Sequence, residues 1–509
     1  MTGKVSLVGA GPGDTGLLTL KALKLIKEAD IVIYDYLVNP AHLRLAKPES
    51  LKICLGKGFR HHRLSQNKIN RLIISAARKG RRVVRLKGGD PYLFGRGGEE
   101  ALFLFKHRIP FEVVPGVTSA TACAAYAGIP LTHREHNASV TFLTGHRAHD
   151  DNLDGIDWEK ITGLGGTLVI YMGFYNLEII TKKLIRSGMK PSTKISVIQW
   201  GTLTYQKSCE GTLADITKKV KKAGLSAPSI IIVGEVVSLS KNLNWFEKLP
   251  LFGKRIVVTR TRDKASSLSQ NLESLGAVVM EFPVIEIKPI NDYLEMDTTI
   301  KTLLEFDWVI FTSTYGVDAF FERLEKKHKK DARWLATIKV ACVGPETAEA
   351  LKKRGVLPDL LPNRFETKAL VVEFKNRFKK LAGQNVLLVR TDIAPPDLEI
   401  GLRTLGANLK RVTAYRTVTP RHVSLEIKKE LLKNGADYVT FTSSSTVDHF
   451  VRIVGLKNVK ALAKKGRFVS IGPVTSKTLK SYGLKPACQA RVFTVQGMID
   501  AVLKNKRGK

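Results

Sequence analysis

Short apolar runs alternate with helix-like stretches along the whole chain, and polar or glycine-rich turns follow many of the runs. In VSLVGAGPGDTGLLTLKALK, Val5 to Lys24, an apolar strand-like run meets such a turn and a helix-like run follows. The succession recurs in VVRLKGGDPYLFGRGGEE, FEVVPGVTSATACAAYAGIPL and TLVIYMG. Strands that alternate with helices predict α/β sheets, which we expect to be parallel in the second half of the chain. Ligands of such sheets bind beside the carboxyl ends of the strands, where these turns lie.

The glycine spacing of the opening turn argues against a phosphate-binding loop. A dinucleotide fingerprint has glycine at its first, third and sixth positions, and here Gly9 and Gly11 fit but the sixth position is Asp14. Pro12 also removes a backbone N–H that a phosphate would need. The turn therefore either approaches a ligand that has no leading phosphate or is a tight turn without a ligand.

Other strand-end turns carry glycine together with Asp90, Thr118 or Met172. Asp90 follows two glycines, so its carboxylate could accept hydrogen bonds from a ligand's hydroxyl or amine. Together the turns predict a site that is apolar, closely approached by backbone and not led by phosphate. S-adenosylmethionine fits this description, since it has an adenosine, a cationic sulfonium and no phosphate.

The second half of the chain contains an internal repeat. DWVIFTSTYGVDAFF, from Asp307, matches DYVTFTSSSTVDHFV, from Asp437, at an offset of roughly 130 residues. KVACVGPETAEALKKRGV and RFVSIGPVTSKTLKSYGL match at the same offset. Two similar α/β domains follow from this repeat, with a cleft between them as the expected ligand site. The serines and threonines after the strands either line that cleft or cap the next helices, and both roles can coexist.

A domain boundary is expected near residue 250. Pro250 and Gly253 interrupt the pattern before a fresh strand, IVVTR, so Asn242–Lys254 is predicted to be a linker. We expect this linker to be flexible and each half to have its own core.

The chain of 509 residues is strongly basic, with 82 Lys and Arg against 46 Asp and Glu, a formal net charge of +36. Such a charge attracts polyanions, either nucleic acid or a small polycarboxylate, although a generally basic proteome would also explain it. The basic residues are spread along the chain and no aromatic-rich RNA-binding signature accompanies them. We therefore expect small-molecule substrates and no nucleic-acid partner.

Cysteine spacing and hydropathy indicate the cellular compartment that we expect for the protein. No apolar run approaches the ~20 residues of a membrane span. MTGKVSLVGAG enters a strand without a signal segment. The five cysteines are scattered without a C-x-x-C pair. We expect a cytoplasmic protein that binds no membrane and no metal.

The first half resembles uroporphyrinogen-III C-methyltransferases of the tetrapyrrole methylase family. The resemblance rests on VGAGPGD, ADIVIYDYLV, LGK, VRLKGGDPYLFGRGGEE, PGVTSATACAAYAGIPLTHRE, TLVIYMG and SAPSIIIVGEVV, in this order. The second half resembles uroporphyrinogen-III synthases through VVTR, FTS, VGPETA, AYRT and IGPVT. The implied domains are a two-lobed methylase over 1–246 and a synthase of two similar parallel-sheet domains over 252–509. These enzymes catalyse consecutive steps.

The resemblance to the methyltransferases implies site residues, S-adenosylmethionine as methyl donor, and a homodimer formed through this half. The implied cofactor-binding positions are Pro12, Gly88, Gly89, Asp90, Leu93, Thr118, Ser119, Met172 and Gly201. Asp35 matches the general base and Lys57 the general acid, whereas the alternatives are a loop-capping carboxylate and a solvated lysine. Arg60, His61, His62 and Arg63 either hold substrate carboxylates or form a solvated loop. The implied reaction methylates uroporphyrinogen III at C2 and C7 and gives precorrin-2.

The resemblance to the synthases implies closure of hydroxymethylbilane with inversion of the last ring and loss of water. Tyr415 matches the tyrosine that would protonate the leaving hydroxyl, although it could be only a strand tyrosine at the domain hinge. Ser313, Thr347 and Thr475 match positions that face the cleft. The family's connectivity implies that the last segment of the chain completes the first of the two domains.

Two rival interpretations remain. The methylase class includes ribosomal-RNA ribose methylases and diphthine synthases, and one of these could be fused to an α/β binding module. Neither rival accounts for the synthase-like half. The chain has no second Gly-rich dinucleotide fingerprint, so we do not expect it to oxidise or metallate its product, as the multifunctional sirohaem synthases do.

Overall fold

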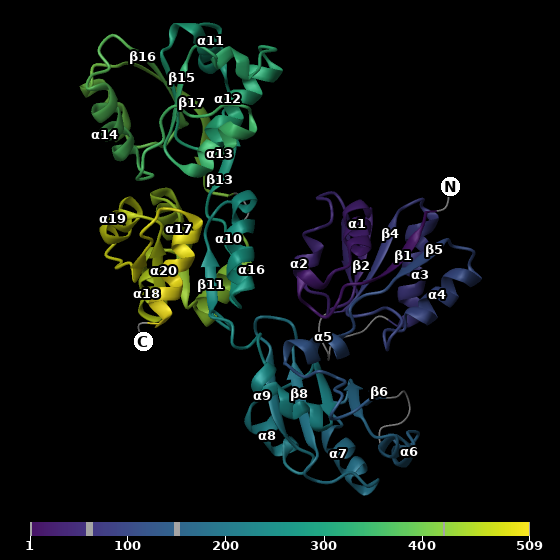
Figure 1. Ribbon diagram of the computed structural model, residues 1–509. Helices are drawn as coiled ribbons and strands as arrows, with labels where there is room; N and C mark the ends of the chain where they lie inside the picture. The colour runs from purple at the N-terminus through teal and green to yellow at the C-terminus, as the bar shows by residue number, and fades with distance from the viewer. Residues whose placement is uncertain (1–2, 57–64, 147–152, 421–422, 508–509) are drawn as a thin grey trace. The chain divides into compact units, whose positions relative to one another are not determined.

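The computed structural model describes residues 3–56, 65–146, 153–420 and 423–507 and divides into two compact units (Figure 1). Unit 1 is Met1–Gly253 and unit 2 is Lys254–Lys509. Within the described ranges, each unit contains two five-stranded sheets with helices between the strands. The predicted α/β class is therefore confirmed.

The first sheet of unit 1 is parallel throughout, in the order β3-β2-β4-β1-β5. Its central strands β1 and β4 are buried along their whole length, and β4 buries Arg85 and Lys87 among its apolar residues. The strands are β1 (Val5–Gly9), β2 (Ile31–Tyr34), β3 (Leu51–Cys54), β4 (Val83–Lys87) and β5 (Phe111–Val114). The helices are η1 (Thr15–Leu17), α1 (Leu20–Glu28), α2 (Pro40–Leu43), α3 (Gln66–Arg78) and α4 (Gly97–Lys106).

The second sheet of unit 1 is mixed, in the order β6-β7-β10-β8-β9. Strands β9 and β10 run antiparallel to their neighbours. Because β7 and β8 both oppose β10, their carboxyl ends share one edge. The strands are β6 (Val140–Thr144), β7 (Thr167–Tyr171), β8 (Lys194–Gln199), β9 (Lys207–Thr212) and β10 (Ser229–Val233). The helices are α5 (Ser119–Tyr126), α6 (Trp158–Gly163), α7 (Leu177–Arg186), α8 (Ile216–Lys222), η2 (Glu235–Leu239) and α9 (Ser240–Leu243).

The segment predicted to be a flexible linker packs against unit 1 instead. Phe246 and Leu251 are buried, and the ring of Phe246 lies 4.7 Å from that of Tyr126 at the end of α5. The indole of Trp245 donates a hydrogen bond of 3.1 Å to the carbonyl of Ala125. The prediction of flexibility was wrong because Pro and Gly mark the turns of this segment, whereas its aromatic residues supply a packing surface.

Unit 2 interleaves its two sheets along the chain. The first, β12-β11-β18-β19-β20, is parallel and joins the start of the unit to its end. Its strands are β11 (Arg255–Val258), β12 (Val278–Glu281), β18 (Tyr438–Phe441), β19 (Arg467–Ser470) and β20 (Cys488–Gln489). Its helices are α10 (Arg262–Ser274), α16 (Leu425–Asn434), α17 (Ser444–Val454), α18 (Leu456–Lys465), α19 (Pro473–Ser481) and α20 (Val495–Arg507). The implied completion of the first domain by the last segment is confirmed.

The intervening residues form the second sheet of unit 2, β13-β17-β16-β14-β15, in which only the edge strand β13 is antiparallel. Its strands are β13 (Glu286–Pro289), β14 (Trp308–Phe311), β15 (Lys339–Cys342), β16 (Asn385–Thr391) and β17 (Asn408–Val418). Its helices are α11 (Leu294–Lys301), η3 (Leu303–Glu305), α12 (Thr314–Lys326), η4 (Ala332–Leu335), α13 (Pro345–Lys353), α14 (Thr367–Phe378) and α15 (Asp397–Thr404).

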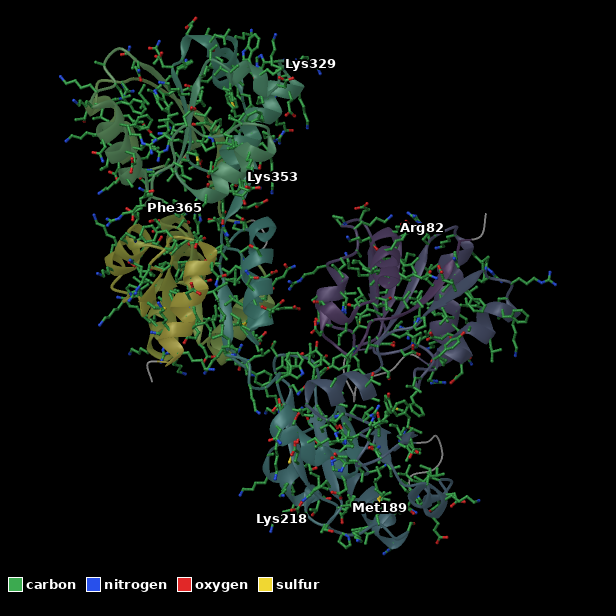
Figure 2. All side chains as sticks on the ribbon, in the orientation of Figure 1. Arg82, Met189, Lys218, Lys329, Lys353 and Phe365 are labelled. Carbon is green, nitrogen blue, oxygen red and sulfur yellow. The ribbon has the colours of Figure 1, made fainter. Side chains whose placement is uncertain are left out.

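The positive charge is distributed over both units. Figure 2 labels exposed basic side chains that lie far apart in the sequence, namely Arg82, Lys218, Lys329 and Lys353. None of the described helices combines the length and apolar composition needed to span a bilayer. The described His, Cys, Asp and Glu side chains form no group of three placed to hold a metal ion.

Candidate active sites in the two units

Three glycine-rich turns meet at the carboxyl edge of the first sheet of unit 1. Gly11 and Gly89, both with positive φ, exchange backbone hydrogen bonds of 3.2 and 2.7 Å. A Cβ atom on Gly116 would lie 2.3 Å from the carbonyl oxygen of Gly89, and one on Gly9 would lie 2.5 Å from the nitrogen of Gly116. Glycine is therefore required here, because the turns after β1, β4 and β5 touch through their backbones.

The carboxylate of Asp90 links two of these turns by hydrogen bonds. Its Oδ1 accepts hydrogen bonds from the backbone N–H groups of Tyr92 and Leu93, at 2.8 and 3.1 Å. Its Oδ2 accepts one from the N–H of Gly116, at 3.1 Å. The carboxylate that the sequence assigned to a ligand thus first shapes the site, and Gly88, Gly89, Asp90 and Leu93 all lie on this one turn.

The turn that contains Pro12 is where the two lobes of unit 1 meet. The backbone N–H of Asp14 donates to Oγ1 of Thr202, at 3.1 Å, and the hydroxyl of Tyr126 donates to Oδ2 of Asp14, at 2.6 Å. Burial, with the Asp14 carboxylate adding to it, raises the pKa of Tyr126 well above its ordinary value. Asp14 also caps η1, accepting from the N–H of Gly16 at 2.7 Å, so the residue that breaks the dinucleotide pattern has a structural role.

Thr118 and Ser119 begin α5 beside the end of β7. Oγ1 of Thr118 lies 2.5 Å from the hydroxyl of Tyr171, the last residue of β7. Burial raises the pKa of this tyrosine. Met172 follows directly, with a φ of 53° and a half-exposed side chain. Sequence reasoning missed Tyr171, although its place directly before Met172 at the strand end was a usable signal.

Backbone strain is concentrated at this edge of the second sheet. Besides Met172, Trp200 and Thr202 have φ values of 49° and 69°, and they flank Gly201 after β8. A Cβ atom on Gly201 would lie 2.3 Å from Sγ of Cys123 in α5. Such φ values cost free energy in residues other than glycine and are typical of ligand sites. Helix α5 contacts the ends of both β7 and β8, through Thr118 and Cys123. The nine predicted cofactor positions therefore lie on one connected set of turns.

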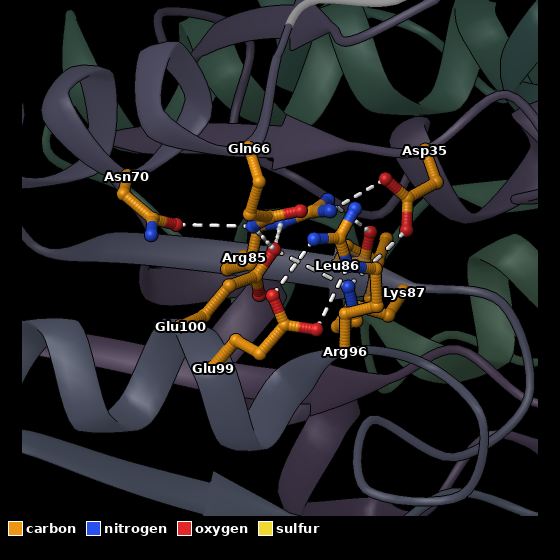
Figure 3. Close-up of polar contacts among 9 residues, drawn as sticks. All are labelled: Asp35, Gln66, Asn70, Arg85, Leu86, Lys87, Arg96, Glu99 and Glu100. Carbon is orange, nitrogen blue, oxygen red and sulfur yellow. Dashed lines mark hydrogen bonds and ion pairs between the residues drawn. The ribbon is translucent and has the colours of Figure 1, made fainter. Parts of the chain in front are cut away.

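Asp35, the predicted base, follows β2 and is about one-third exposed (Figure 3). Its Oδ1 accepts a hydrogen bond of 2.5 Å from Nη2 of Arg85, and its Oδ2 lies 3.6 Å from Nζ of Lys87. Both cations also contact the buried carboxylate of Glu100. Burial lowers the pKa of Lys87. The sequence did not single out this cluster, because an arginine and a lysine inside an apolar strand carry no signal of burial.

Lys57, the predicted acid, lies outside the described residues, as do Arg60, His61, His62 and Arg63. Their predicted roles stay predictions.

In unit 2, the structure brings Tyr415 and Ser313 together. Tyr415 lies on β17 and is almost fully buried, and burial raises its pKa. Its hydroxyl donates a hydrogen bond of 2.9 Å to Oγ of Ser313. Ser313 also caps α12, and Ser443 caps α17 at the matching place in the repeat. The capping alternative is therefore confirmed for both serines, and it leaves room for a ligand role at Ser313.

Thr347 and Thr475 occupy matching positions in the two domains of unit 2, each in the first turn of a helix that begins with a proline. Both are buried, with 5% and 3% of their surface exposed. Two contacts link the domains nearby. Oγ1 of Thr261 lies 2.7 Å from the hydroxyl of Tyr315, and the guanidinium of Arg260 donates to the carboxylate of Glu346.

Comparison with known proteins identifies both units. The family of tetrapyrrole (corrin/porphyrin) methylases matches residues 4–217, and that of uroporphyrinogen-III synthase HemD matches residues 266–500. The porphyrin biosynthesis protein HemD of Ruminiclostridium josui is 37% identical over 502 residues, which cover 99% of this chain and 98% of that protein. The chain belongs to this family of fused enzymes. It combines a uroporphyrinogen-III methyltransferase in unit 1 with a uroporphyrinogen-III synthase in unit 2, as the motifs predicted.

Further comparisons find methyltransferases. The uroporphyrinogen-III C-methyltransferase of Bacillus subtilis is 41% identical over 360 residues, 70% of this chain and 72% of that protein. A crystal structure of uroporphyrin-III C-methyltransferase from Thermus thermophilus, complexed with S-adenyl homocysteine, is 40% identical. It covers 47% of this chain and all of its own, with a TM-score of 0.40. Unit 1 is an S-adenosylmethionine-dependent methyltransferase of the tetrapyrrole methylase family.

Proposed function

We propose that unit 2 closes hydroxymethylbilane to uroporphyrinogen III and that unit 1 methylates this product at C2 and C7 to give precorrin-2. The observation that carries the proposal is the connected set of glycine turns at the lobe junction of unit 1. These turns present backbone and hydroxyl groups without a phosphate cradle. The domain limits that we propose for the two activities are 1–246 and 252–509.

The residues of this set of turns fit S-adenosylmethionine, which supplies an electrophilic methyl group when bound. The turns of Gly88 and Gly89 let backbone approach a ligand closely, because neither residue has a side chain. Thr118 and Ser119 provide hydroxyls, and Asp90 holds its turn in shape. Met172 presents a half-exposed thioether at the edge. We propose that Pro12, Leu93 and Gly201 complete the cofactor contacts and that no metal takes part.

Exposed side chains around the site fit a large, flat substrate that carries carboxylates. Tyr36, Leu37, Tyr92 and Phe94 are each at least one-third exposed and follow β2 and β4 at the same sheet edge as Asp35. Aromatic faces bind flat ring systems. The basic surface of the protein favours capture of ionised acetate and propionate groups.

Asp35 is proposed to accept the proton that the ring system sheds after methylation, because its carboxylate is partly exposed and held by Arg85. Lys57 is proposed as the general acid. In unit 2, we propose that the hydroxyl of Tyr415 protonates the leaving hydroxyl of the linear substrate, which departs as water. A raised pKa keeps this phenol protonated and able to donate. Ser313, Thr347 and Thr475 are proposed to face the substrate.

Purified protein supplied with hydroxymethylbilane and S-adenosylmethionine tests the proposal. We expect uroporphyrinogen III alone without the methyl donor and precorrin-2 with it. Ribosomal RNA serves as the competing methyl acceptor, and methylation of RNA but not of the porphyrinogen would refute the assignment. Sedimentation analysis of residues 1–253 tests the proposed homodimer, and cell fractionation tests the proposed cytoplasmic location.

A further inference from the structure

Asp35 is the exposed end of a charge cluster that is otherwise removed from solvent (Figure 3). Arg85 and Lys87 are alternate residues of β4, so their side chains leave the same face of the sheet. Glu100 reaches them from α4. The side chains of Arg85, Lys87 and Glu100 are 2%, 5% and 0% exposed, against 33% for Asp35. Ion pairs thus connect three buried charged side chains to the partly exposed carboxylate of the proposed base.

The contacts within the cluster are reciprocal, since each cation meets both carboxylates. Nε of Arg85 donates to Oε1 of Glu100 at 3.0 Å, while its Nη2 donates to Asp35 at 2.5 Å. Nζ of Lys87 lies 3.3 Å from Glu100 and 3.6 Å from Asp35. The amide of Gln66 on α3 adds a third donor to Glu100, at 3.2 Å. Two positive and two negative charges therefore balance.

Burial of three charges is a poor way to stabilise a fold, because desolvation offsets much of their attraction. Because the cluster ends in the partly exposed carboxylate of Asp35, its geometry points instead to a role in holding that carboxylate in place. We infer that Arg85 and Glu100 are positioning residues for methyl transfer. Glu100 holds the guanidinium of Arg85, and Arg85 in turn orients the carboxylate of Asp35. The inference rests on the proposed function, in which Asp35 is the base.

The same balance accounts for the return of the base to its starting state. When Asp35 takes the proton, the C–H bond of the methylated ring system breaks and its electron pair stays in the ring. Asp35 becomes neutral, so Arg85 and Lys87 face only the charge of Glu100. Loss of the proton from the exposed side of Asp35 to water restores the balance of two positive and two negative charges.

The test compares substitutions at Arg85 and Glu100 in the full-length protein. Arg85→Gln removes the guanidinium that holds Asp35, so kcat of methyl transfer should fall at least ~10-fold while KM for uroporphyrinogen III changes little. Glu100→Gln removes the carboxylate that holds Arg85 and should lower kcat in the same way. Lys47→Gln, which breaks an ion pair with Asp30 before β2, should leave kcat unchanged.

Melting curves and calorimetric binding of S-adenosylhomocysteine report whether each variant is folded. If Arg85→Gln fails to fold, Lys87→Gln removes another cation that contacts both carboxylates and should also lower kcat. The double variant of Arg85→Gln and Glu100→Gln should lose no more kcat than Arg85→Gln alone, because Glu100 acts through Arg85.

An unchanged kcat in folded variants, or losses that add in the double variant, would overturn the inference while leaving Asp35 as the base. Asp35→Asn tests the proposed function separately from this inference. Full methyl transfer by that variant would refute the role of Asp35 as the base.

Discussion

The hydroxyl of Tyr415 donates a hydrogen bond to Oγ of Ser313 across 102 positions of sequence. Tyr415 comes from β17, and Ser313 stands between β14 and α12, whose N-terminus it caps. The ring of Tyr415 also lies 5.7 Å from that of Tyr315. The hydroxyl of Tyr315 in turn reaches Thr261 in the other domain of unit 2. The proposed acid of the synthase is therefore next to the contact between its two domains.

Tyr415→Phe removes the proposed proton donor and keeps the packed ring. We expect the rate of uroporphyrinogen III formation to fall by ~10²-fold or more, while methylation of supplied uroporphyrinogen III is unchanged. The control is Tyr482→Phe, which removes a hydroxyl bound to Asp448 in the same unit. An unimpaired cyclisation rate in Tyr415→Phe would contradict the assignment.

Gly116→Ala tests whether the touching turns of unit 1 form the cofactor site. The added Cβ would lie 2.3 Å from a backbone oxygen of Gly89, so we expect a loss of about 1–3 kcal/mol in the free energy of unfolding. Binding of S-adenosylhomocysteine, measured by calorimetry, should weaken at least ~10-fold because the turns must separate. Gly98→Ala is the matched control, since a Cβ there has no neighbour within 4 Å. Equal binding by both variants would exclude the site.

The packed segment after α9 predicts a dependence of unit 1 on its last residues. We expect residues 1–253 to unfold at a clearly higher temperature than residues 1–243, which lack Phe246 and Leu251. In the longer fragment, Phe246→Ala should lower the free energy of unfolding by about 3–5 kcal/mol. Leu243→Ala is the control, because that side chain is half exposed. Thermal unfolding followed by circular dichroism measures all four proteins, and identical curves would mean that the segment is only a tether.

His42 predicts how the stability of unit 1 depends on pH. Complete burial lowers the pKa of its imidazole, although the carboxylate of Asp14 opposes this shift. The unfolded chain therefore binds a proton near pH ~6.5 that the folded unit rejects. The free energy of unfolding should be complete above this pH and should decrease as the pH falls through the folded pKa. In residues 1–253, His42→Leu should flatten this dependence, and a change at exposed His136 should not. Urea unfolding between pH 5 and pH 8 measures the effect, and equal slopes would refute it.

Local sequence was sufficient to predict strands, the type of the opening turn and the repeated domains. The apolar run Val5–Gly9 has no polar alternation because both faces of a central parallel strand are covered, so period and length alone identify it. The absent sixth glycine at Asp14 correctly excluded a dinucleotide loop as the family match now shows. The repeat in the second half marked two similar domains because each copy must bury its own apolar faces.

Tertiary structure decided which of these residues meet. Asp35, Arg85 and Glu100 are far apart in sequence, and only the parallel order of β2 and β4 with α4 across them assembles the cluster. The antiparallel course of β10 was equally hidden, since an apolar run buried on both faces reads the same in either direction. Sequence therefore determined which helix or strand each segment can form and to which family the chain belongs. Burial and strand order, which depend on contacts between distant segments, decided which charges are paired and which side chains remain exposed to act.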